Sequence, residues 1–180
     1  MRSTCIASIV ALSSLVGCSS EGPIDPAATH DILATASMLD ATGDQVGEAI
    51  LINKEGAISI ELSVADLEPG ESALHLHSIG ECNAPDFTSA GGHLNPFERE
   101  HGSLNPQGQH LGDLPNLTVD EDGAGSTIFE FSGGTPELAD LIFDEDGTAV
   151  MLHAGPDDYL SDPAGAAGPR VACGVLQKAN

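Results

Sequence analysis

Hydrophobic and polar residues alternate in several short segments of the chain, which is the pattern of half-buried β-strands rather than of helices. Turn-forming sequences such as Thr42-Gly43-Asp44 and Lys54-Glu55-Gly56 separate these segments. We therefore predict an all-β fold of roughly eight antiparallel strands, a Greek-key barrel or sandwich that needs no helix. The expected strands are residues 32–39, 48–53, 57–64, 73–79, 116–119, 126–131, 141–143, 148–153 and 170–176.

Two turns rich in aspartate each lie between two expected strands and predict β-hairpins. Asp120 to Gly123 joins the strands at 116–119 and 126–131, and Asp144 to Gly147 precedes the strand at 148–153. Calcium binding is the alternative for such turns, but an EF-hand loop needs further ligands at fixed offsets and a closing glutamate. We therefore interpret both segments as acidic hairpin turns.

Two connections are too long to be simple turns, residues 80–112 and 154–169. Connections of this length without secondary structure are usually functional or disordered. Six of the seven histidines lie in or beside them. We therefore expect these two long loops to hold the chemistry of the protein.

The N-terminus has the features of an export signal. Residues 1–17 carry one positive charge and a short apolar stretch that is too short to span a bilayer, which is typical of a secretory signal peptide. Leu15-Val16-Gly17-Cys18 resembles the lipobox of bacterial lipoproteins, and this resemblance implies a lipidated Cys18 as the first mature residue. The alternative is a plain signal peptide cleaved near Gly17, with Cys18 incidental.

Residues 18–30 contain two prolines and no apolar periodicity, so they predict a flexible tether in front of a domain at 31–180. Ser19 directly after the cysteine resembles lipoproteins sorted to the outer membrane. The predicted location is therefore the periplasmic side of a bacterial membrane, with the lipid as the only membrane contact.

Charge excludes some partners. The chain has 28 acidic and 5 basic residues and a formal net charge of -23 at pH 7. A nucleic acid backbone or an anionic lipid surface would repel such a chain, so we expect neither as a partner.

Cysteines also fit an exported protein. If Cys5 leaves with the signal peptide and Cys18 carries lipid, Cys82 and Cys173 remain in the domain. Two cysteines in an oxidising compartment predict one disulfide, and free buried thiols are the alternative.

A first group of histidines suits one metal ion. His75 and His77 are two residues apart in an expected strand, so both side chains project to the same face. His153 lies at the end of another expected strand, and His93 in the first long loop could join the group. Imidazole ligands favour copper or zinc.

A second group lies in the first long loop and directly after it. His93, His101, His110 and Asp113 offer three nitrogens and one carboxylate oxygen within twenty-one residues. Four such ligands form the closed set of a tetrahedral zinc site. A hydrolase that uses zinc-activated water is disfavoured, because such an enzyme needs an open position on the metal.

Short motifs surround these residues throughout the chain. They are His75-Leu-His77, Cys82, Ser89-Ala-Gly-Gly-His93-Leu-Asn-Pro96, His101-Gly102, His110-Leu-Gly-Asp-Leu-Pro115, His153-Ala-Gly-Pro-Asp157-Asp-Tyr159 and Arg170-Val-Ala-Cys-Gly-Val175. With these motifs, the segment from residue 31 to 178 resembles the copper/zinc superoxide dismutases.

The resemblance implies an enzyme that converts superoxide to dioxygen and hydrogen peroxide by cycling one copper ion, with one zinc ion also bound to each subunit. It implies that the ligands are His75, His77, His93 and His153 for copper, and His93, His101, His110 and Asp113 for zinc. His93 would bridge the two ions, and the disulfide would join Cys82 to Cys173.

Three further implications concern catalysis and assembly. Asp157 would link the two metal sites, Arg170 would attract superoxide beside the copper, and His93 would donate a proton. The resemblance leaves a homodimer open. An exported copper/zinc-binding module without turnover is the alternative, since it would need the histidines but not Arg170.

One segment departs from the family pattern. Gly70-Glu-Ser-Ala-Leu74 stands where the family usually has Gly-Leu-His-Gly-Phe, just before His75. No ligand position is lost, so we expect the departure to change the packing under this strand rather than the activity.

Overall fold

The computed structural model describes residues 30–132 and 136–179. The predicted signal peptide, Cys18 and residues 19–29 of the predicted tether lie outside this part of the chain. None of the helices among the described residues is long and apolar enough to cross a lipid bilayer.

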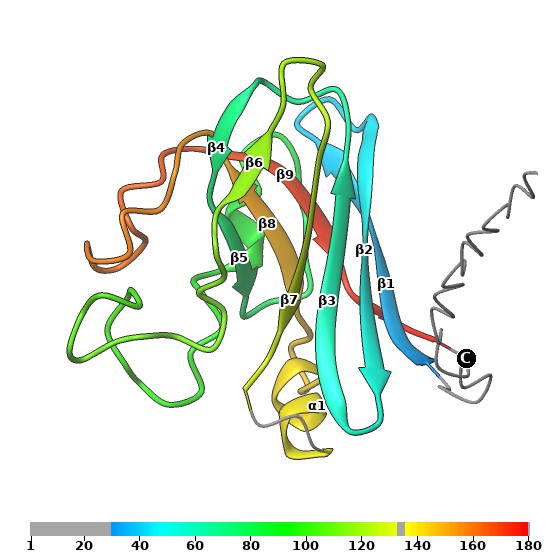
Figure 1. The fold of residues 1–180 in the computed structure, drawn as a ribbon, viewed down its shortest axis with the longest axis vertical. Coiled ribbons are helices and arrows are strands. Elements are labelled where there is room, and N and C mark those ends of the chain that lie inside the picture. The colour runs from blue at the N-terminus through cyan, green and yellow to red at the C-terminus, as the bar shows by residue number, and fades with distance from the viewer. Residues whose placement is uncertain (1–29, 133–135, 180) are drawn as a thin grey trace, which may run out of the picture.

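The described residues form one large antiparallel sheet and one small one (Figure 1). The large sheet has the order β5-β8-β9-β1-β2-β3-β7, with β10 paired to β1, and β4 pairs with β6. The bounds are β1 His30–Asp40, β2 Gln45–Lys54, β3 Ala57–Val64, β4 Gly70–Ser72, β5 Leu74–His77, β6 Leu117–Val119, β7 Gly125–Glu130, β8 Ala149–His153, β9 Arg170–Val175 and β10 Gln177–Lys178. The predicted all-β, antiparallel architecture is confirmed.

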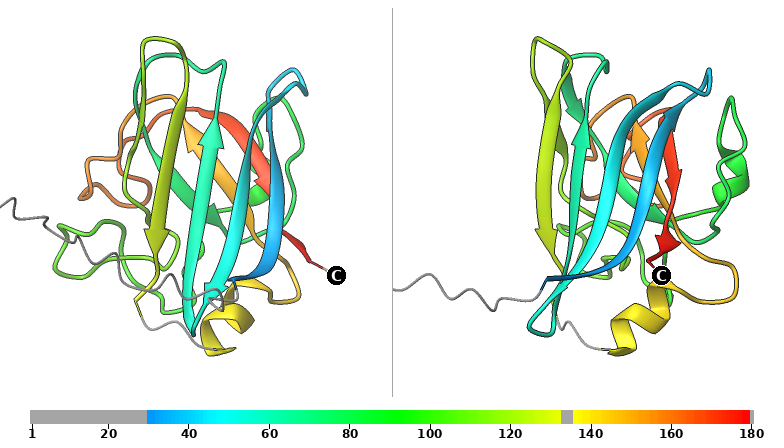
Figure 2. Two further views of the ribbon diagram at one scale, coloured as in Figure 1. Left: turned by 45° about the vertical axis from the view of Figure 1, so that its right-hand side comes forward. Right: turned by 90° about the vertical axis from the view of Figure 1, so that its right-hand side faces the viewer.

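The large sheet is strongly curled (Figure 2). Mostly aliphatic side chains form the core that it encloses. Along β3, Ile58, Ile60, Leu62 and Val64 are buried, while the residues between them are more exposed. This period of two is the strand geometry that the sequence pattern predicts. Each fully buried side chain of this size contributes about 1.5–3 kcal/mol, so the alternation fixes which face of the sheet turns inward.

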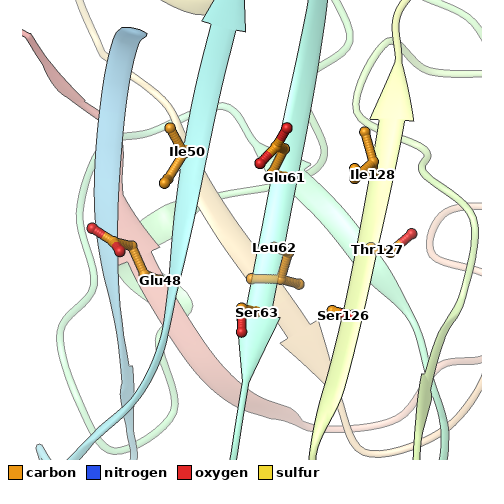
Figure 3. Close-up of a pocket in the computed structure, with 8 residues that line it drawn as sticks. All are labelled: Glu48, Ile50, Glu61, Leu62, Ser63, Ser126, Thr127 and Ile128. Atoms are coloured by element: carbon orange, nitrogen blue, oxygen red, sulfur yellow. The ribbon is translucent and has the colours of Figure 1, made fainter. Parts of the chain in front are cut away.

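The outer face of β2, β3 and β7 is mixed in character. Ile50, Glu61 and Ile128 are paired neighbours on adjacent strands, and Figure 3 shows them beside a shallow depression of about 410 Å³. Ile128 is 69% exposed. Glu48 and Glu61 keep this face charged, and none of the histidines that the sequence singles out lines it.

One predicted strand is wrong. Residues 141–143 do not form a strand; α1 spans Pro136–Ile142. Leu138 and Ile142, one turn apart on this helix, are both buried. Proline is favoured at the first helical position, and an acidic residue such as Glu137 is favoured in the first turn. The segment therefore has the signals of a helix start, which the prediction overlooked because it considered only the apolar residues 141–143. The expected hairpin into β8 is therefore absent from the described residues.

The other predicted hairpin is only partly correct. Its turn forms, because the Asp120 N–H donates to the Ala124 carbonyl at 2.8 Å and the Asp120 carboxylate accepts the backbone N–H groups of Asp122 and Ala124. However, β6 pairs with β4, whereas β7 pairs with β3. The chain passes from the small sheet to the large one at this turn.

The two long loops lie against each other beside the sheet (Figure 1). The Leu104 N–H donates to the Tyr159 carbonyl at 2.9 Å, and the His101 N–H donates to the Asp162 carboxylate at 2.8 Å. A Cys82–Cys173 disulfide attaches the start of the first loop to β9. The predicted disulfide is confirmed, and it anchors the loop to a central strand.

Removal of this disulfide should strongly destabilise the domain. The bond closes a sequence separation of 91 residues, and the chain-entropy model assigns such a loop about 4–5 kcal/mol. We expect the Cys82→Ser/Cys173→Ser variant to lose about this much free energy of unfolding in chemical denaturation of the metal-free protein. A loss below about 1 kcal/mol would contradict this role for the bond.

Candidate metal centre

Backbone pairing along β5 sets the frame of the site. His75 and His77 lie on this strand. His77 bridges to His93 in the first long loop, and His75 bridges to Asp113 directly after that loop. The Leu94 N–H donates to the Leu76 carbonyl at 2.8 Å, so the loop continues the sheet beyond its edge strand. This pairing carries loop residues to the side of the strand histidines.

A four-histidine cluster lies on this frame. It consists of His75, His77, His93 and His153. All four side chains are buried, and one donor atom from each lies within 4.8 Å of the other three. Four ring nitrogens have no hydrogen-bond partner, namely Nδ1 of His75 and Nε2 of His77, His93 and His153.

The opposite nitrogen of each ring is fixed by an acceptor. His75 Nε2 donates to Asp157 Oδ2 at 3.0 Å, and His93 Nδ1 lies 2.9 Å from Asp113 Oδ1. His77 Nδ1 and His153 Nδ1 each donate at 3.0 Å to a backbone carbonyl, of Gly91 and Gly168 respectively. Such bonds fix the tautomer and aim the free nitrogen of each ring.

Burial keeps these rings neutral. It lowers the pKa of His75 to about 4, and it lowers the pKa values of His77, His93 and His153 as well, with the neighbouring imidazoles adding to the effect. A neutral imidazole has a lone pair on its unprotonated nitrogen. Four buried lone pairs with no protein donor therefore form a ready-made set of metal ligands.

A second cluster surrounds the Asp113 carboxylate. Its Oδ1 lies 2.9 Å from His93 Nδ1, 3.1 Å from His101 Nδ1 and 3.0 Å from His110 Nδ1. Its Oδ2 accepts the N–H groups of Gly102 and His110. Burial raises the pKa of Asp113, but these hydrogen bonds outweigh burial and hold the pKa well below its usual value. The carboxylate is therefore ionised among three imidazoles.

His75 also lies near this second cluster. One of its nitrogens is within 4.8 Å of donor atoms of His93, His101 and Asp113. However, His75 Nε2 is hydrogen-bonded to Asp157, and the unpartnered His75 Nδ1 belongs to the four-histidine cluster. His110 Nδ1 is in direct contact with Asp113, so His110 completes the second cluster.

Asp157 connects the two clusters. Its Oδ2 contacts His75 Nε2 at 3.0 Å and its Oδ1 contacts His101 Nε2 at 2.9 Å. Burial raises the pKa of this carboxyl group, but the hydrogen bonds from both histidines and from the Tyr159 N–H lower it to about 2. Gly165 leaves room for the carboxylate, because a Cβ there would overlap Asp157 Oδ1.

Sequence reasoning missed the residue that holds Asp157. The Asn116 side chain accepts the Asp157 N–H at 2.8 Å and donates to the Asp157 carbonyl at 3.0 Å. The Tyr159 hydroxyl in turn accepts the Asn116 N–H at 2.8 Å. Asn116 is 41 residues away in the sequence, directly before β6, so no local signal could have identified it.

Arg170 lies beside the four-histidine cluster at the start of β9. Its Nη1 donates to the Phe87 carbonyl, and its Nη2 donates to the Gly91 carbonyl at 2.6 Å. The Gly91 carbonyl also accepts His77 Nδ1, so one oxygen links the guanidinium to a ring of the cluster. The side chain is thereby held in place near the four free nitrogens.

Known proteins are similar to this chain in sequence and in fold. The sequence profile of the copper/zinc superoxide dismutases matches residues 45–176. A copper/zinc superoxide dismutase of Aquifex aeolicus is 43% identical over 151 residues, which cover 82% of this chain and 89% of that protein. The enzyme of Caulobacter vibrioides is 37% identical over 152 residues, covering 80% and 85% of the two chains.

Solved structures agree with these sequence relatives. A superoxide dismutase-like protein of Bacillus subtilis superposes with a TM-score of 0.73 at 36% identity, covering 82% of this chain and all of the other. The copper/zinc superoxide dismutase of Brucella abortus gives 0.64 at 29% identity, covering 83% of this chain and all of the other. With this shared fold, and with a family profile that spans both histidine clusters, the chain belongs to the copper/zinc superoxide dismutase family.

Proposed function

We propose that the protein is a superoxide dismutase that holds one copper ion at the four-histidine cluster and one zinc ion at the second cluster. The observation that carries the proposal is the set of four buried, unpartnered imidazole nitrogens within 4.8 Å of one another. Family membership alone is weaker support, since the relative from Bacillus subtilis is described only as superoxide dismutase-like.

The donor atoms support the assignment of the two metals. Four imidazole nitrogens at the first cluster suit copper, which can alternate between Cu(II) and Cu(I) and so accept an electron from one superoxide and pass it to another. Three imidazoles and one carboxylate at the second cluster suit tetrahedral zinc. His93 belongs to both clusters, with Nε2 toward the first and Nδ1 toward the second.

Arg170 would bind and orient the substrate. Superoxide is a small anion, and an arginine stays protonated at any physiological pH. Two backbone carbonyls fix the guanidinium beside His77, so its charge is in place before the anion arrives. This arrangement also disfavours the alternative of a metal-binding module without turnover, because such a module would need no anion site.

His93 would move a proton. Reduction of superoxide to hydrogen peroxide takes up two protons, whereas oxidation of superoxide to dioxygen takes up none. His93 Nε2 has no partner within the protein, so it can carry a proton whenever it is not acting as a ligand. His93 Nδ1 remains beside Asp113 at 2.9 Å, which holds the ring in position while Nε2 changes its state.

We also propose that the protein is anchored to the periplasmic side of a bacterial membrane, most simply the outer membrane, through lipid on Cys18. The lipobox-like sequence and the following tether support this location. With a net charge of -23, the chain itself has no attraction to anionic lipid. A homodimer stays a prediction.

Two histidine variants test the metal assignment. His93→Ala should remove both metals and abolish catalysed superoxide decay, because His93 contributes a nitrogen to each cluster. His77→Ala should remove copper and activity but keep zinc, and it is a cleaner choice than His75 because it has no contact with Asp157. Elemental analysis of the purified variants beside a superoxide-decay assay gives the answer. Equal loss of zinc in both variants would rule out the shared role of His93.

Loss of the Arg170 charge should slow the enzyme without removing its metal ions. Because a fixed cation raises the local concentration of an anionic substrate, we expect Arg170→Gln to lower kcat/KM for superoxide at least about tenfold while copper and zinc content stay constant. Arg99→Gln is the matched control, because Arg99 also donates to a backbone carbonyl but lies in an exposed part of the first loop. Equal rates in the two variants would exclude the assigned role.

The anchor can be tested by fractionation of the producing cells. The wild-type protein should be found with membranes, and Cys18→Ser should move it to the soluble fraction because the acyl chains are its only attachment. Ser19→Ala is a control that keeps the cysteine. If the wild-type protein is already soluble, the lipobox interpretation is wrong.

A further inference from the structure

The segment that departs from the family pattern contacts a histidine of the four-histidine cluster. Ser72, the last residue of β4, is 7% exposed, and its Oγ donates to the His153 carbonyl at 2.5 Å. The two residues are 81 positions apart in the sequence. Ser72 stands where the family usually has a histidine. It is in direct contact with the backbone of a proposed copper ligand.

The pairing of the sheet is irregular beside His153, on the side of β9. The pairing of β8 with β9 shifts register between Leu152 and His153, which marks a β-bulge or similar irregularity. The extra residue is Val171 of β9, because Leu152 pairs with Ala172 and His153 pairs with Arg170. Bulges re-aim side chains next to active sites. Here the His153 N–H donates to the Ala73 carbonyl at 3.0 Å, and the His153 carbonyl accepts the Ser72 hydroxyl.

Ser72 and Ala73 thus bind the carbonyl and the N–H of His153, respectively. On the ring, Nδ1 donates to the Gly168 carbonyl at 3.0 Å and Nε2 faces the cluster. These three contacts from two segments, together with the pairing of His153 with Arg170, position this imidazole. The Ser72 hydroxyl is the contact from β4.

A cavity of about 260 Å³ adjoins this contact. Ser72 and His153 both line it, with Leu67, Val119 and Val171 among the apolar residues around them. A serine side chain is small, so it leaves this space beside the His153 backbone. The cavity means that the His153 carbonyl is held by a hydrogen bond on this side rather than by close packing.

We propose that Ser72 is a positioning residue for His153. Its hydroxyl fixes the carbonyl at the irregular end of β8 and so aims Nε2 toward the other three nitrogens of the cluster. The inference rests on the proposed copper site at this cluster. It predicts that the hydroxyl, rather than the volume of the side chain, controls the affinity and geometry of that site.

The cavity allows a test in which only the hydroxyl changes. Threonine and valine have nearly the same shape, and the cavity of about 260 Å³ beside Ser72 is larger than the methyl groups that either substitution adds. Threonine keeps the donor to the His153 carbonyl, whereas valine lacks it. We expect Ser72→Val to bind Cu(II) about tenfold more weakly in competition with a chelator and to change the copper EPR spectrum, as removal of a supporting hydrogen bond does at other metal sites. Ser72→Thr should resemble the wild type in both, and zinc affinity should be unchanged in all three.

Thr148→Val is the matched control for general loss of stability. The Thr148 Oγ1 also donates to a backbone carbonyl, of Ile142 at 2.6 Å, and Thr148 is 1% exposed and directly precedes β8, at the end away from His153. It should lose stability without any change in copper affinity or EPR spectrum. Equal copper affinity in Ser72→Val and Ser72→Thr, or an equal loss in Thr148→Val, would overturn the proposal.

A metal-free measurement separates this inference from the proposed function. The ring resonances of His153 in nitrogen-15 NMR spectra of the metal-free protein should shift in Ser72→Val but not in Ser72→Thr. If the wild-type protein binds no copper, the proposed function fails, while this spectrum still decides whether Ser72 positions His153. If copper binds and the His153 resonances are identical in both variants, the positioning role fails alone.

Discussion

The main constraint on this structure is the burial of four imidazole nitrogens that have no partner within the protein. An unsatisfied buried polar group costs about 1–3 kcal/mol, so this arrangement opposes folding unless something else binds the nitrogens. Each ring is instead fixed through its other nitrogen, by a carboxylate or by a glycine carbonyl. The protein thus bears the cost of burial and, in return, presents a rigid, neutral set of ligands to a metal ion.

Two carboxylates make this arrangement one unit rather than two adjacent sites. Asp113 gathers three imidazoles around one oxygen, and Asp157 joins His75 to His101 through its two oxygens. Because Asp157 belongs to the second long loop and His101 to the first, the same contact fastens the loops together. Asn116 then ties Asp157 to the strand region, so the position of the loops and the geometry of both clusters are set together.

An enzyme for an anionic substrate has to solve an electrostatic problem when its own net charge is -23. At physiological salt, fields between exposed charges decay over about 8 Å, so the distant acidic surface matters less than the charges next to the cluster. Arg170 is fixed there by the Phe87 and Gly91 carbonyls. A local cation in a fixed orientation can therefore guide superoxide on a surface that repels it overall.

The sequence by itself determined the strand pattern, the disulfide-capable cysteines and the residue types that suit two metals, because alternation and ligand chemistry are local properties. It misjudged residues 141–143, where a short apolar run fits a strand as well as one face of α1, and burial of Leu138 and Ile142 decided for the helix. Only the tertiary structure could show which nitrogen of each ring is free, since that depends on acceptors such as Asp157 that lie far away in the chain. The contacts of Asn116 and Ser72 were invisible for the same reason: each acts through a backbone group that the fold, not the sequence, brings within hydrogen-bonding distance.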